Sequence, residues 1–470
     1  MEKHNTKSRH LKSGSYSALI TVIVIAVIIV VNLMVNALPA TVTKFDFTEQ
    51  QTFTLSEQTK QMVKGLKEDV TIYVIAQKEN ESQSLLSLLE KYQALSSNLK
   101  VEVKDPAVYP AFTSQYTEET LTDNSLIVVS GEQSRVVTFI EMYDKLGYNE
   151  QDNSLQLTSE SIFVGEDMIT SAIDYVTAES LPKLYIMTGH GEQPIGSFAS
   201  EIQRENISNT TLNLAREGRV PEDADCILME APTSDISAAE AQALSDYLKK
   251  GGKFFYVSYF AKNATPNLDG LLKEYGIQVA DGFVCEGAGN YYGSYPAWVS
   301  PVYGSHEIVN PLAKAQMQMI LTIPQHIELL EDRADSITVT PLLRTSSSAY
   351  LKQVNAETME KQAGDKNGVM NLAVAVEKND TKIIVATTYD LFSEQSNEQV
   401  SGGNYDFLLN SIGYLCEHES MVAIRGKQVY SNSLTVTSGH TMLWIFVLMI
   451  IIPLVCLIAG LVLWARRRKR

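Results

Sequence analysis

The stretch Lys183–Glu192, KLYIMTGHGE, constrains the fold of this chain more than any other. Its apolar part is short and continuous, which is typical of a strand buried on both faces. It ends in a Gly-His-Gly turn, where glycines on both sides of His190 let the backbone reverse sharply. The residues therefore predict a buried parallel strand that ends at His190.

The chain after this turn repeats the same pattern. Cys226–Glu230 (CILME) reads as a second strand, Ala238–Lys250 as an amphipathic helix that stops at Gly251, and Lys253–Tyr259 as a third strand. Strands that alternate with helices indicate an open parallel sheet with helices on both faces, a doubly wound α/β fold. Ligands of such sheets bind beyond the carboxyl ends of the strands, where His190 is expected.

Both ends of the chain carry a long apolar segment without charged residues. Tyr16–Leu38 would form a helix of ~34 Å at about 1.5 Å per residue, enough to span a bilayer. Thr441–Trp464 is a second such segment and is followed by the basic residues Arg466–Arg470. Basic flanks at both outer ends predict a plasma-membrane protein with two transmembrane helices, cytoplasmic termini and an extracytoplasmic centre. Alternatively, the first segment is a signal peptide cleaved after Val35–Ala37.

The charge and the cysteines exclude several classes of function. The formal charge of the chain is −17, although both ends are basic, so the centre is strongly acidic and would repel nucleic acid. The chain has four cysteines. Cys456 lies in an apolar segment, and the scattered Cys226, Cys285 and Cys416 form neither a disulfide framework nor a zinc motif. No metal or cofactor is expected.

Between the two apolar segments we expect two folded regions. The first shows a helix after Ser56, a strand–helix–strand order over 70–103 and a hairpin turned at Gly131-Glu132. This order is loosely thioredoxin-like, but the region lacks a Cys-x-x-Cys motif. The expected organisation has these parts: 1–15 cytoplasmic, 16–38 transmembrane, 39–148 small α/β domain, 149–420 large α/β domain, 421–440 linker, 441–464 transmembrane and 465–470 cytoplasmic.

Several segments together resemble the GldG-like family of auxiliary components of ABC transport systems. They are, in order, FTLSEQT (53–59), KLYIMTGHGE (183–192), 225–256, LDGLLKEYGIQVADGFV (268–284) and GNYDFLLNSIGYL (403–415), with a membrane segment at each end. The resemblance implies an extracytoplasmic domain with a fold like that of class I glutamine amidotransferases. It also implies a role beside a separate permease and a separate ATP-binding subunit. The chain itself has no Gly-x-x-x-x-Gly-Lys-Ser/Thr phosphate loop.

The residues do not supply the nucleophile of an amidotransferase. That chemistry needs a cysteine or serine on a sharp strand-to-helix turn with small neighbours. Cys226 lies inside a predicted strand, Cys285 follows an apolar run, and Cys416 ends a predicted helix. Ser258 follows a strand but lies between Val257 and Tyr259, which would crowd such a turn. We therefore expect no catalytic residues and no enzyme.

Three places in the chain are candidates for contact with a ligand or partner. His190 and Glu192 lie at the expected strand end, where they could form a base or half of a metal site, or simply hold the turn. Asp390 follows the expected strand Lys382–Thr388 and could equally cap the next segment. The loop 286–304 is rich in aromatic residues, which could contact an envelope protein or glycan or could pack onto the sheet. They are Tyr291, Tyr292, Tyr295, Trp298 and Tyr303.

These observations leave three functional hypotheses. The first is a non-catalytic subunit of an ABC transport system whose helices contact the permease and whose outer domain contacts substrate or an envelope partner. The second is a membrane-anchored hydrolase or amidotransferase relative that uses His190 with a distant nucleophile. The third is a scaffold that binds envelope glycan or protein through Tyr291–Tyr303. The sequence leaves the transported compound, the stoichiometry and the role of the His190 turn open.

Overall fold

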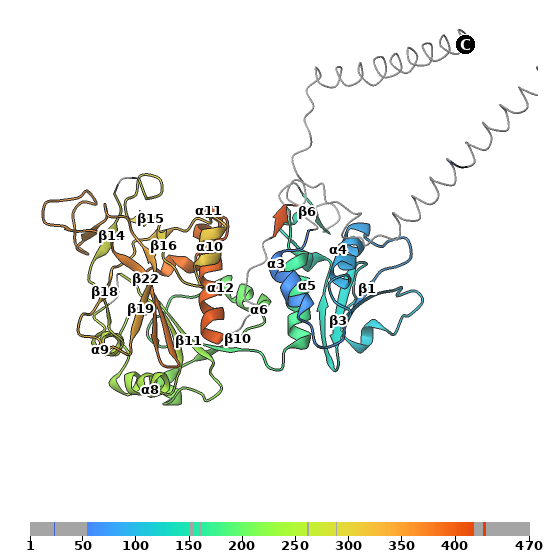
Figure 1. The fold of residues 1–470 in the computed structure, drawn as a ribbon, viewed down its shortest axis with the longest axis horizontal. Helices are drawn as coiled ribbons and strands as arrows, with labels where there is room; N and C mark the ends of the chain where they lie inside the picture. The colour runs from blue at the N-terminus through green and yellow to red at the C-terminus, as the bar shows by residue number, and fades with distance from the viewer. Residues whose placement is uncertain are drawn as a thin grey trace, which may run out of the picture.

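The computed structural model describes residue 23 and residues 54–149, 154–158, 161–260, 263–287, 289–417 and 426–428. The predicted transmembrane segments 16–38 and 441–464 lie outside these residues, apart from residue 23. Within the described part of the chain, no helix has the length and apolar character needed to cross a bilayer. The described residues form two domains, which Figure 1 shows side by side.

The small domain is built on a four-stranded sheet in the order β2-β1-β3-β4. β1 and β2 run parallel, and β3 and β4 follow as an antiparallel hairpin, which confirms the predicted order. Its main elements are α3 (Glu57–Lys64), β1 (Val70–Ile75), α4 (Gln83–Gln93), β2 (Leu99–Lys104), β3 (Ser125–Ser130), β4 (Gln133–Val137) and α5 (Gly165–Thr177). Shorter elements are η1 (Thr113–Gln115), η2 (Ile140–Met142), β6 (Gly147–Asn149) and β7 (Ser154–Gln156).

Helix α5 belongs to the small domain, although residues 149–420 are expected in the large one. Its buried side chains, among them Ile169 and Ile173, join the same apolar core as Ile72 and Leu126 of the sheet. The reason is the apolar face of α5, which covers β3 and β4. The packing therefore places the boundary between the two cores after α5.

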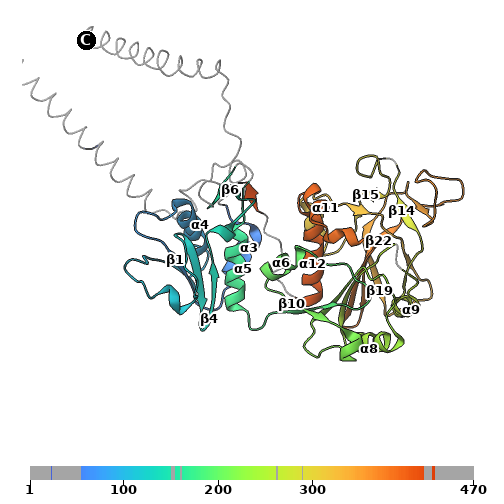
Figure 2. The same ribbon diagram turned by 180° about the vertical axis from the view of Figure 1, so that it is seen from behind.

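The end of the described chain returns to the small domain. β5 (Tyr143–Asp144), β8 (Ile162–Phe163) and β24 (Lys427–Gln428) form a three-stranded sheet in the order β24-β8-β5. Lys427 pairs with Phe163, and Gln428 pairs with Ile162. The large domain is therefore inserted between α5 and β24, and Leu55 and Gln428 both belong to the small domain. Figures 1 and 2 show the small domain, with β1 and α5, from opposite sides.

The large domain is built on one mixed sheet. Five neighbouring strands, in the order β10-β9-β11-β12-β23, are parallel, whereas β22, β18, β13 and β19 pair in antiparallel fashion. The parallel half confirms the α/β prediction, but the sheet is not parallel throughout. The strands are β9 (Lys183–Met187), β10 (Ser208–Leu212), β11 (Cys226–Glu230), β12 (Lys253–Val257), β13 (Ile277–Val279), β18 (Ile327–Leu329), β19 (Thr338–Arg344), β22 (Asn371–Lys378) and β23 (Thr381–Ala386).

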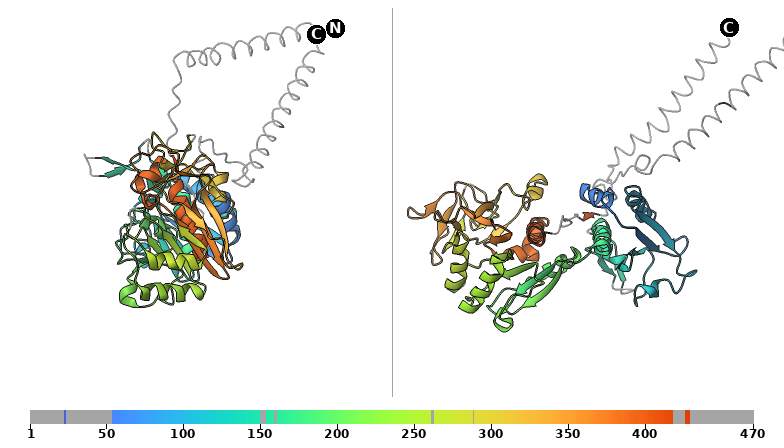
Figure 3. Two further views of the ribbon diagram at one scale, coloured as in Figure 1. Left: turned by 90° about the vertical axis from the view of Figure 1, so that its left-hand side faces the viewer. Right: turned by 60° about the horizontal axis from the view of Figure 1, so that its bottom comes forward.

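Helices cover both faces of this sheet, as Figure 3 shows. α6 (Phe198–Arg204) and α12 (Gly403–Cys416) pack on one face, against side chains such as Leu228 and Phe255. α8 (Ala238–Lys249) and α9 (Pro266–Glu274) pack on the other, against side chains such as Ile227 and Phe254. Alternate residues of β11 and β12 thus enter opposite cores, which explains why these strands are apolar at every position.

The remaining elements of the large domain are short. They are α7 (Leu214–Glu217), β14 (Phe283–Cys285), β15 (Trp298–Val299), β16 (Val302–Tyr303), α10 (Asn310–Lys314), β17 (Leu321–Thr322), β20 (Tyr350–Lys352), β21 (Lys366–Asn367), η3 (Tyr389–Phe392) and α11 (Glu394–Gln399). Several of them form an outer layer of two- and three-stranded sheets that holds the aromatic loop.

Candidate functional site

The loops after β9 and β11 meet at the point where the order of the parallel strands reverses. From β9 the chain proceeds to β10 on one side, and from β11 it proceeds to β12 on the other side. Such a reversal leaves a crevice beyond the carboxyl ends of the two central strands, and this is the usual ligand position in α/β sheets. His190 follows β9, and Glu230 ends β11. The predicted location of His190 is therefore confirmed.

The imidazole of His190 lies between two carboxylates. Its Nδ1 atom is 3.0 Å from Oε1 of Glu192, and its Nε2 atom is 3.1 Å from Oε1 of Glu240. All three side chains are more than nine-tenths buried. Both contacts are hydrogen bonds at the same time only when each ring nitrogen carries a proton. Both nitrogens are thus occupied within the domain.

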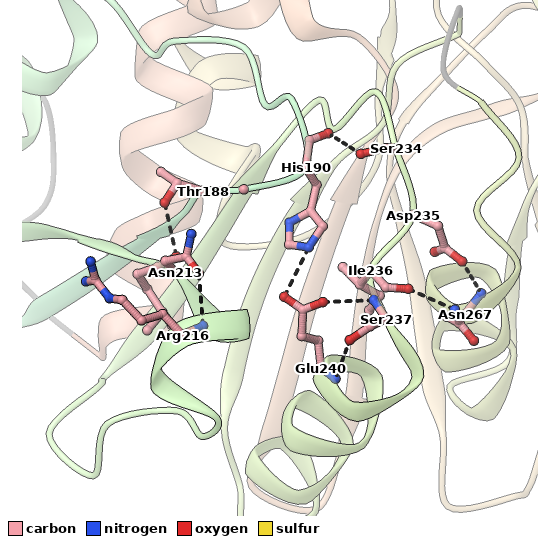
Figure 4. A network of polar contacts seen from close by, with 12 residues as sticks. Thr188, His190, Asn213, Arg216, Ser234, Asp235, Ile236, Ser237, Glu240 and Asn267 are labelled. Atoms are coloured by element: carbon pink, nitrogen blue, oxygen red, sulfur yellow. Dashed lines mark hydrogen bonds and ion pairs between the residues drawn. The ribbon is translucent and has the colours of Figure 1, made fainter.

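The side chains of His190, Glu192 and Glu240 hold the ends of neighbouring secondary-structure elements in place. Glu192 accepts hydrogen bonds from the backbone N–H groups of Gly189 and His190 through its Oε2 atom, at 3.0 and 2.8 Å. Glu240 accepts from the backbone N–H of Ser237, whose hydroxyl in turn accepts from the N–H of Glu240. This capping box begins α8, and Figure 4 shows His190 joined to it.

Hydrogen bonds and a local positive charge decide the acidity of Glu240. Burial disfavours the carboxylate, but the bonds from Ser237 and His190 outweigh it, so the pKa of Glu240 lies below its usual value. Glu240 is therefore ionised at neutral pH and pairs with the histidine as an acceptor.

The backbone of the turn is fixed as well. The carbonyl oxygen of His190 accepts hydrogen bonds from the backbone N–H groups of Thr233 and Ser234 and from the Ser234 hydroxyl. Gly191 has a φ of 72°, and a Cβ atom there would lie 2.1 Å from Oγ1 of Thr233. Only glycine fits this position, because any side chain would collide with the neighbouring loop.

Asp390 and the aromatic loop are also engaged within the domain. Asp390 accepts a hydrogen bond of 2.6 Å from the Ser396 hydroxyl and so holds α11, while its own N–H is capped by Thr388. In the loop, Trp298 belongs to β15 and is half-buried, and its ring lies 4.7 Å from that of Tyr295. Tyr295 is 52% exposed, whereas Tyr291 and Tyr292 are half-buried. The hydroxyl of Tyr292 donates to Gln318.

The positions of the cysteines argue against nucleophilic chemistry. Cys226 is fully buried within β11, and burial raises its pKa well above the usual value. Cys285 is buried in β14, and burial raises its pKa to about 11. A thiol acts as a nucleophile in its thiolate form, which both environments disfavour. The Ser258 hydroxyl donates to Gln325 at 2.8 Å and does not contact the His190 ring.

One residue of this edge was missed by the sequence analysis. Glu230 ends the strand CILME and is 1% exposed, and neither of its carboxyl oxygens has a hydrogen-bond partner among the described residues. Burial, followed by the nearby charge of Glu192, raises its pKa to about 9. In the sequence, the feature that could have singled out Glu230 is an acidic residue directly after four apolar positions. Within the described part of the chain, no group of three or more His, Cys, Asp or Glu residues could hold a metal ion.

Comparison with known proteins supports one family. Residues 181–411 match the family model described as "ABC-type uncharacterized transport system", and residues 49–144 match a domain of unknown function. No curated protein matches the chain. The match over residues 181–411 confirms the resemblance to the GldG-like auxiliary family.

Solved structures of low similarity cover about half of the chain. The structure titled "mmIFT52 N-terminal domain" is 18% identical and covers 50% of this chain and 97% of its own, with a TM-score of 0.38. A glutamine amidotransferase from Thermotoga maritima is 9% identical and covers 51% and 100%, with a TM-score of 0.30. The PurLQS structure from Thermotoga maritima is 11% identical and covers 50% and 100%, with a TM-score of 0.29.

Proposed function

From the membership of residues 181–411 in the auxiliary family of ABC-type transport systems, we propose that this chain is a non-catalytic, membrane-anchored subunit of such a system. Its predicted helices at 16–38 and 441–464 contact the permease, and its two folded domains lie outside the plasma membrane. The large domain contacts the substrate or an envelope partner. A separate subunit binds ATP.

The observation that carries this proposal is the return of the chain to the small domain. Residue 54 and the strand β24 both lie on this domain, so both predicted membrane helices connect to the same folded unit. This arrangement does not follow from local sequence patterns, because residues 427–428 pair with a strand more than two hundred residues earlier. Along the described chain, the large domain follows α5 of the small domain and precedes β24. The small domain is thus suited to face the permease, and the large domain to face the envelope.

The contacts between the domains allow a movement of the permease to reach the large domain. Asn206, just before β10, donates to the carbonyl oxygen of Ser171 and to Asp174, both on α5, at 2.8 and 2.9 Å. Arg135 of β4 donates to the same Asn206 at 3.0 Å. Arg204 of α6 contacts Asp144 of β5 at 3.0 Å. These polar contacts connect the anchored domain to the distal one.

The geometry of His190 favours the non-catalytic role over the hydrolase alternative. A general base must present a ring nitrogen to the nucleophile, but both nitrogens of His190 face carboxylates. We propose that the turn is a structural clamp that holds the ligand-facing edge of the sheet.

The test is purification of the full-length protein from its native membrane in mild detergent, followed by mass spectrometry of the co-purified proteins. We expect a multi-span permease and a phosphate-loop ATPase. A variant with Lys427 and Gln428 both replaced by proline removes the pairing of β24 and should reduce this recovery. Recovery of the protein alone, or with cell-wall enzymes only, would contradict the transport role.

The scaffold alternative rests on Tyr295, which is exposed and lies against the half-buried ring of Trp298 at a tilt of 31°. An exposed aromatic ring can stack on a sugar ring. Replacing both residues by Ala should abolish retention on immobilised envelope polysaccharide if the loop binds glycan. Unchanged retention would exclude this loop as a glycan site.

A further inference from the structure

Two of the cysteines that the structure describes lie on the same face of the large sheet. Cys226 begins β11, and its side chain enters the core that α6 and α12 cover, as that of Leu228 does. Cys416 ends α12 and packs against the same core. Cys285, in contrast, belongs to a separate small core of the outer layer. The fold therefore brings together two cysteines that are far apart in the sequence.

The position of Cys416 on α12 directs its side chain toward the sheet. Leu409 and Ile412 lie two turns and one turn earlier on the helix, and both are buried in this core. Cys416 continues their stripe and is half-buried, because it is the last residue of the helix. Cα atoms of α12 and β11 lie within 8 Å of each other, so short side chains can meet between the two elements.

Ion pairs hold the end of α12 beside Cys226. The register of β11 and β12 places Cys226 next to Lys253 on the neighbouring strand. The ammonium group of Lys253 lies 3.5 Å from Oε1 of Glu417, the residue directly after Cys416. Lys382 of β23 contacts the same oxygen at 3.1 Å. The last turn of α12 is thus fixed at the end of the sheet where the Cys226 thiol lies.

The two thiols also act on each other. Burial, followed by a hydrogen bond with the Cys416 side chain, raises the pKa of the Cys226 thiol well above its usual value. Both side chains are free thiols in this structure. Reduction of a disulfide at this place would release a thiolate into the apolar core, which disfavours it. A bond formed here would therefore resist reduction.

We propose that Cys226 and Cys416 form a structural disulfide bond that fastens α12 to the sheet. This inference rests on the proposed function for the location of the domain outside the plasma membrane, where thiols are oxidised rather than kept reduced. The two thiols lose two protons and two electrons as one Sγ–Sγ bond forms. The disulfide of an extracytoplasmic thiol oxidoreductase accepts them and becomes two thiols.

The reaction takes place during folding, before α12 covers Cys226. At that stage both thiols are exposed to water, and the thiolate of one of them attacks the disulfide of the oxidant, which releases the first oxidant thiol. The second cysteine then attacks this mixed disulfide and releases the other oxidant thiol. Docking of α12 on the sheet brings the two cysteines together for this step.

The bond would act where the chain leaves the large domain. α12 is the last helix of this domain before the chain returns to β24 on the small domain, and the second predicted membrane helix follows β24. A pull transmitted along this part of the chain acts on the last turn of α12. A covalent bond at Cys416 keeps the helix on the sheet when the permease moves.

Other roles suit this pair less well. A metal ion needs three or more protein ligands, and the described residues provide no such group of His, Cys, Asp and Glu. Nucleophilic catalysis needs an accessible thiolate, whereas Cys226 is fully buried. The remaining alternative is that both side chains stay unbonded and act as small apolar residues. The experiments below separate this alternative from the bond.

The first experiment uses the full-length protein, isolated from its native membrane and denatured in N-ethylmaleimide, which blocks free thiols. Peptide mass spectrometry without reduction should find Cys226 joined to Cys416, and Cys285 alkylated. The variant Cys285→Ala is the matched control and should keep the joined peptide. Alkylation of both Cys226 and Cys416 in the wild-type protein would overturn the proposal.

The second experiment measures thermal unfolding of the full-length protein in detergent without reductant. Cys416→Ala should lower the Tm by about 5–10 °C, because it removes a bond that closes a long loop. Loss of a half-buried thiol without a bond would change the Tm by less than about 2 °C. A change that small would show that no bond fastens α12.

The disulfide and the transport role fail in different ways. Free thiols in a protein that still co-purifies with a multi-span permease and an ATPase would refute the bond and leave the proposed function intact. A joined peptide in a protein that co-purifies with neither would support the bond and contradict the transport role.

Discussion

The Nε2 atom of His190 lies 3.1 Å from the Oε1 atom of Glu240, and the two residues are fifty positions apart in the chain. This contact joins the turn after β9 to the first turn of α8, and it places one imidazole between two buried carboxylates. The same histidine fixes the loop after β11 through its carbonyl oxygen. His190 therefore joins three segments at this edge of the sheet, two through its ring and one through its backbone carbonyl.

Replacing His190 by Ala should lower the free energy of unfolding by about 3 kcal/mol. The reason is that Glu192 and Glu240 would remain buried without their shared partner. Urea unfolding followed by circular dichroism measures the change. His306→Ala is the control, since that ring is half-buried, accepts one backbone hydrogen bond and packs edge-on against Tyr414 without contacting a buried carboxylate, and it should cost less than about 1 kcal/mol. An equal loss of unfolding free energy in the two variants would show that His190 does not act as a structural clamp.

The stability of the protein should fall as the pH rises through the range set by Glu230. Its pKa is raised from 4.5 to about 9 in the folded state, so the folded protein holds a proton that the unfolded chain loses. The stabilising contribution is complete below pH 4.5 and is lost progressively toward pH 9, at up to ~1.4 kcal/mol per pH unit. Glu230→Gln should flatten this slope. Thermal unfolding between pH 5 and 9 checks it, and identical slopes in both proteins would contradict it.

Lys352→Met should release the loop between β20 and β21. Lys352 is 1% exposed, and its ammonium group donates to Asp365, Gln362 and the carbonyl oxygen of Glu360. Its loss removes all three bonds and leaves Asp365 with the hydrogen bond from the backbone N–H of Gln362, so the loop loses its attachment to the buried ammonium group. Hydrogen exchange over residues 353–365 should accelerate strongly, while β9 to β12 stay protected. Lys366→Met, at an exposed surface pair with Glu328, is the control and should leave exchange in this loop unchanged.

Asn206→Asp should weaken the contact between the two domains. The side chain of Asn206 is 3% exposed and donates to Asp174 at 2.9 Å, so a carboxylate there would face another carboxylate. Asn206→Gly removes the hydrogen bonds without adding charge and keeps the backbone φ of 58° accessible. We expect faster proteolysis of the connection 178–182 in both variants, and more in Asn206→Asp. Unchanged proteolysis would mean that other contacts hold the domains together.

Much of the local structure could be predicted from the sequence. The strands at 183–187, 226–230 and 253–257, and the helix that begins after Ser237, follow from apolar runs, glycines and a capping residue within a few positions. The hairpin turned at Gly131-Glu132 and the cap at Ser56 follow in the same way. His190 was correctly placed at the end of a strand, because the turn that follows it is encoded beside it.

Only the tertiary structure decided what these elements do together. It placed Glu240 against His190, left Glu230 buried without a partner, added an antiparallel half to the sheet, and brought β24 back to β8. The physical reason is the distance along the chain over which each effect acts. Periodicity, capping and turn preference act over a few residues, whereas the pairing of strands and the burial of a carboxyl group depend on which distant segments the topology makes neighbours.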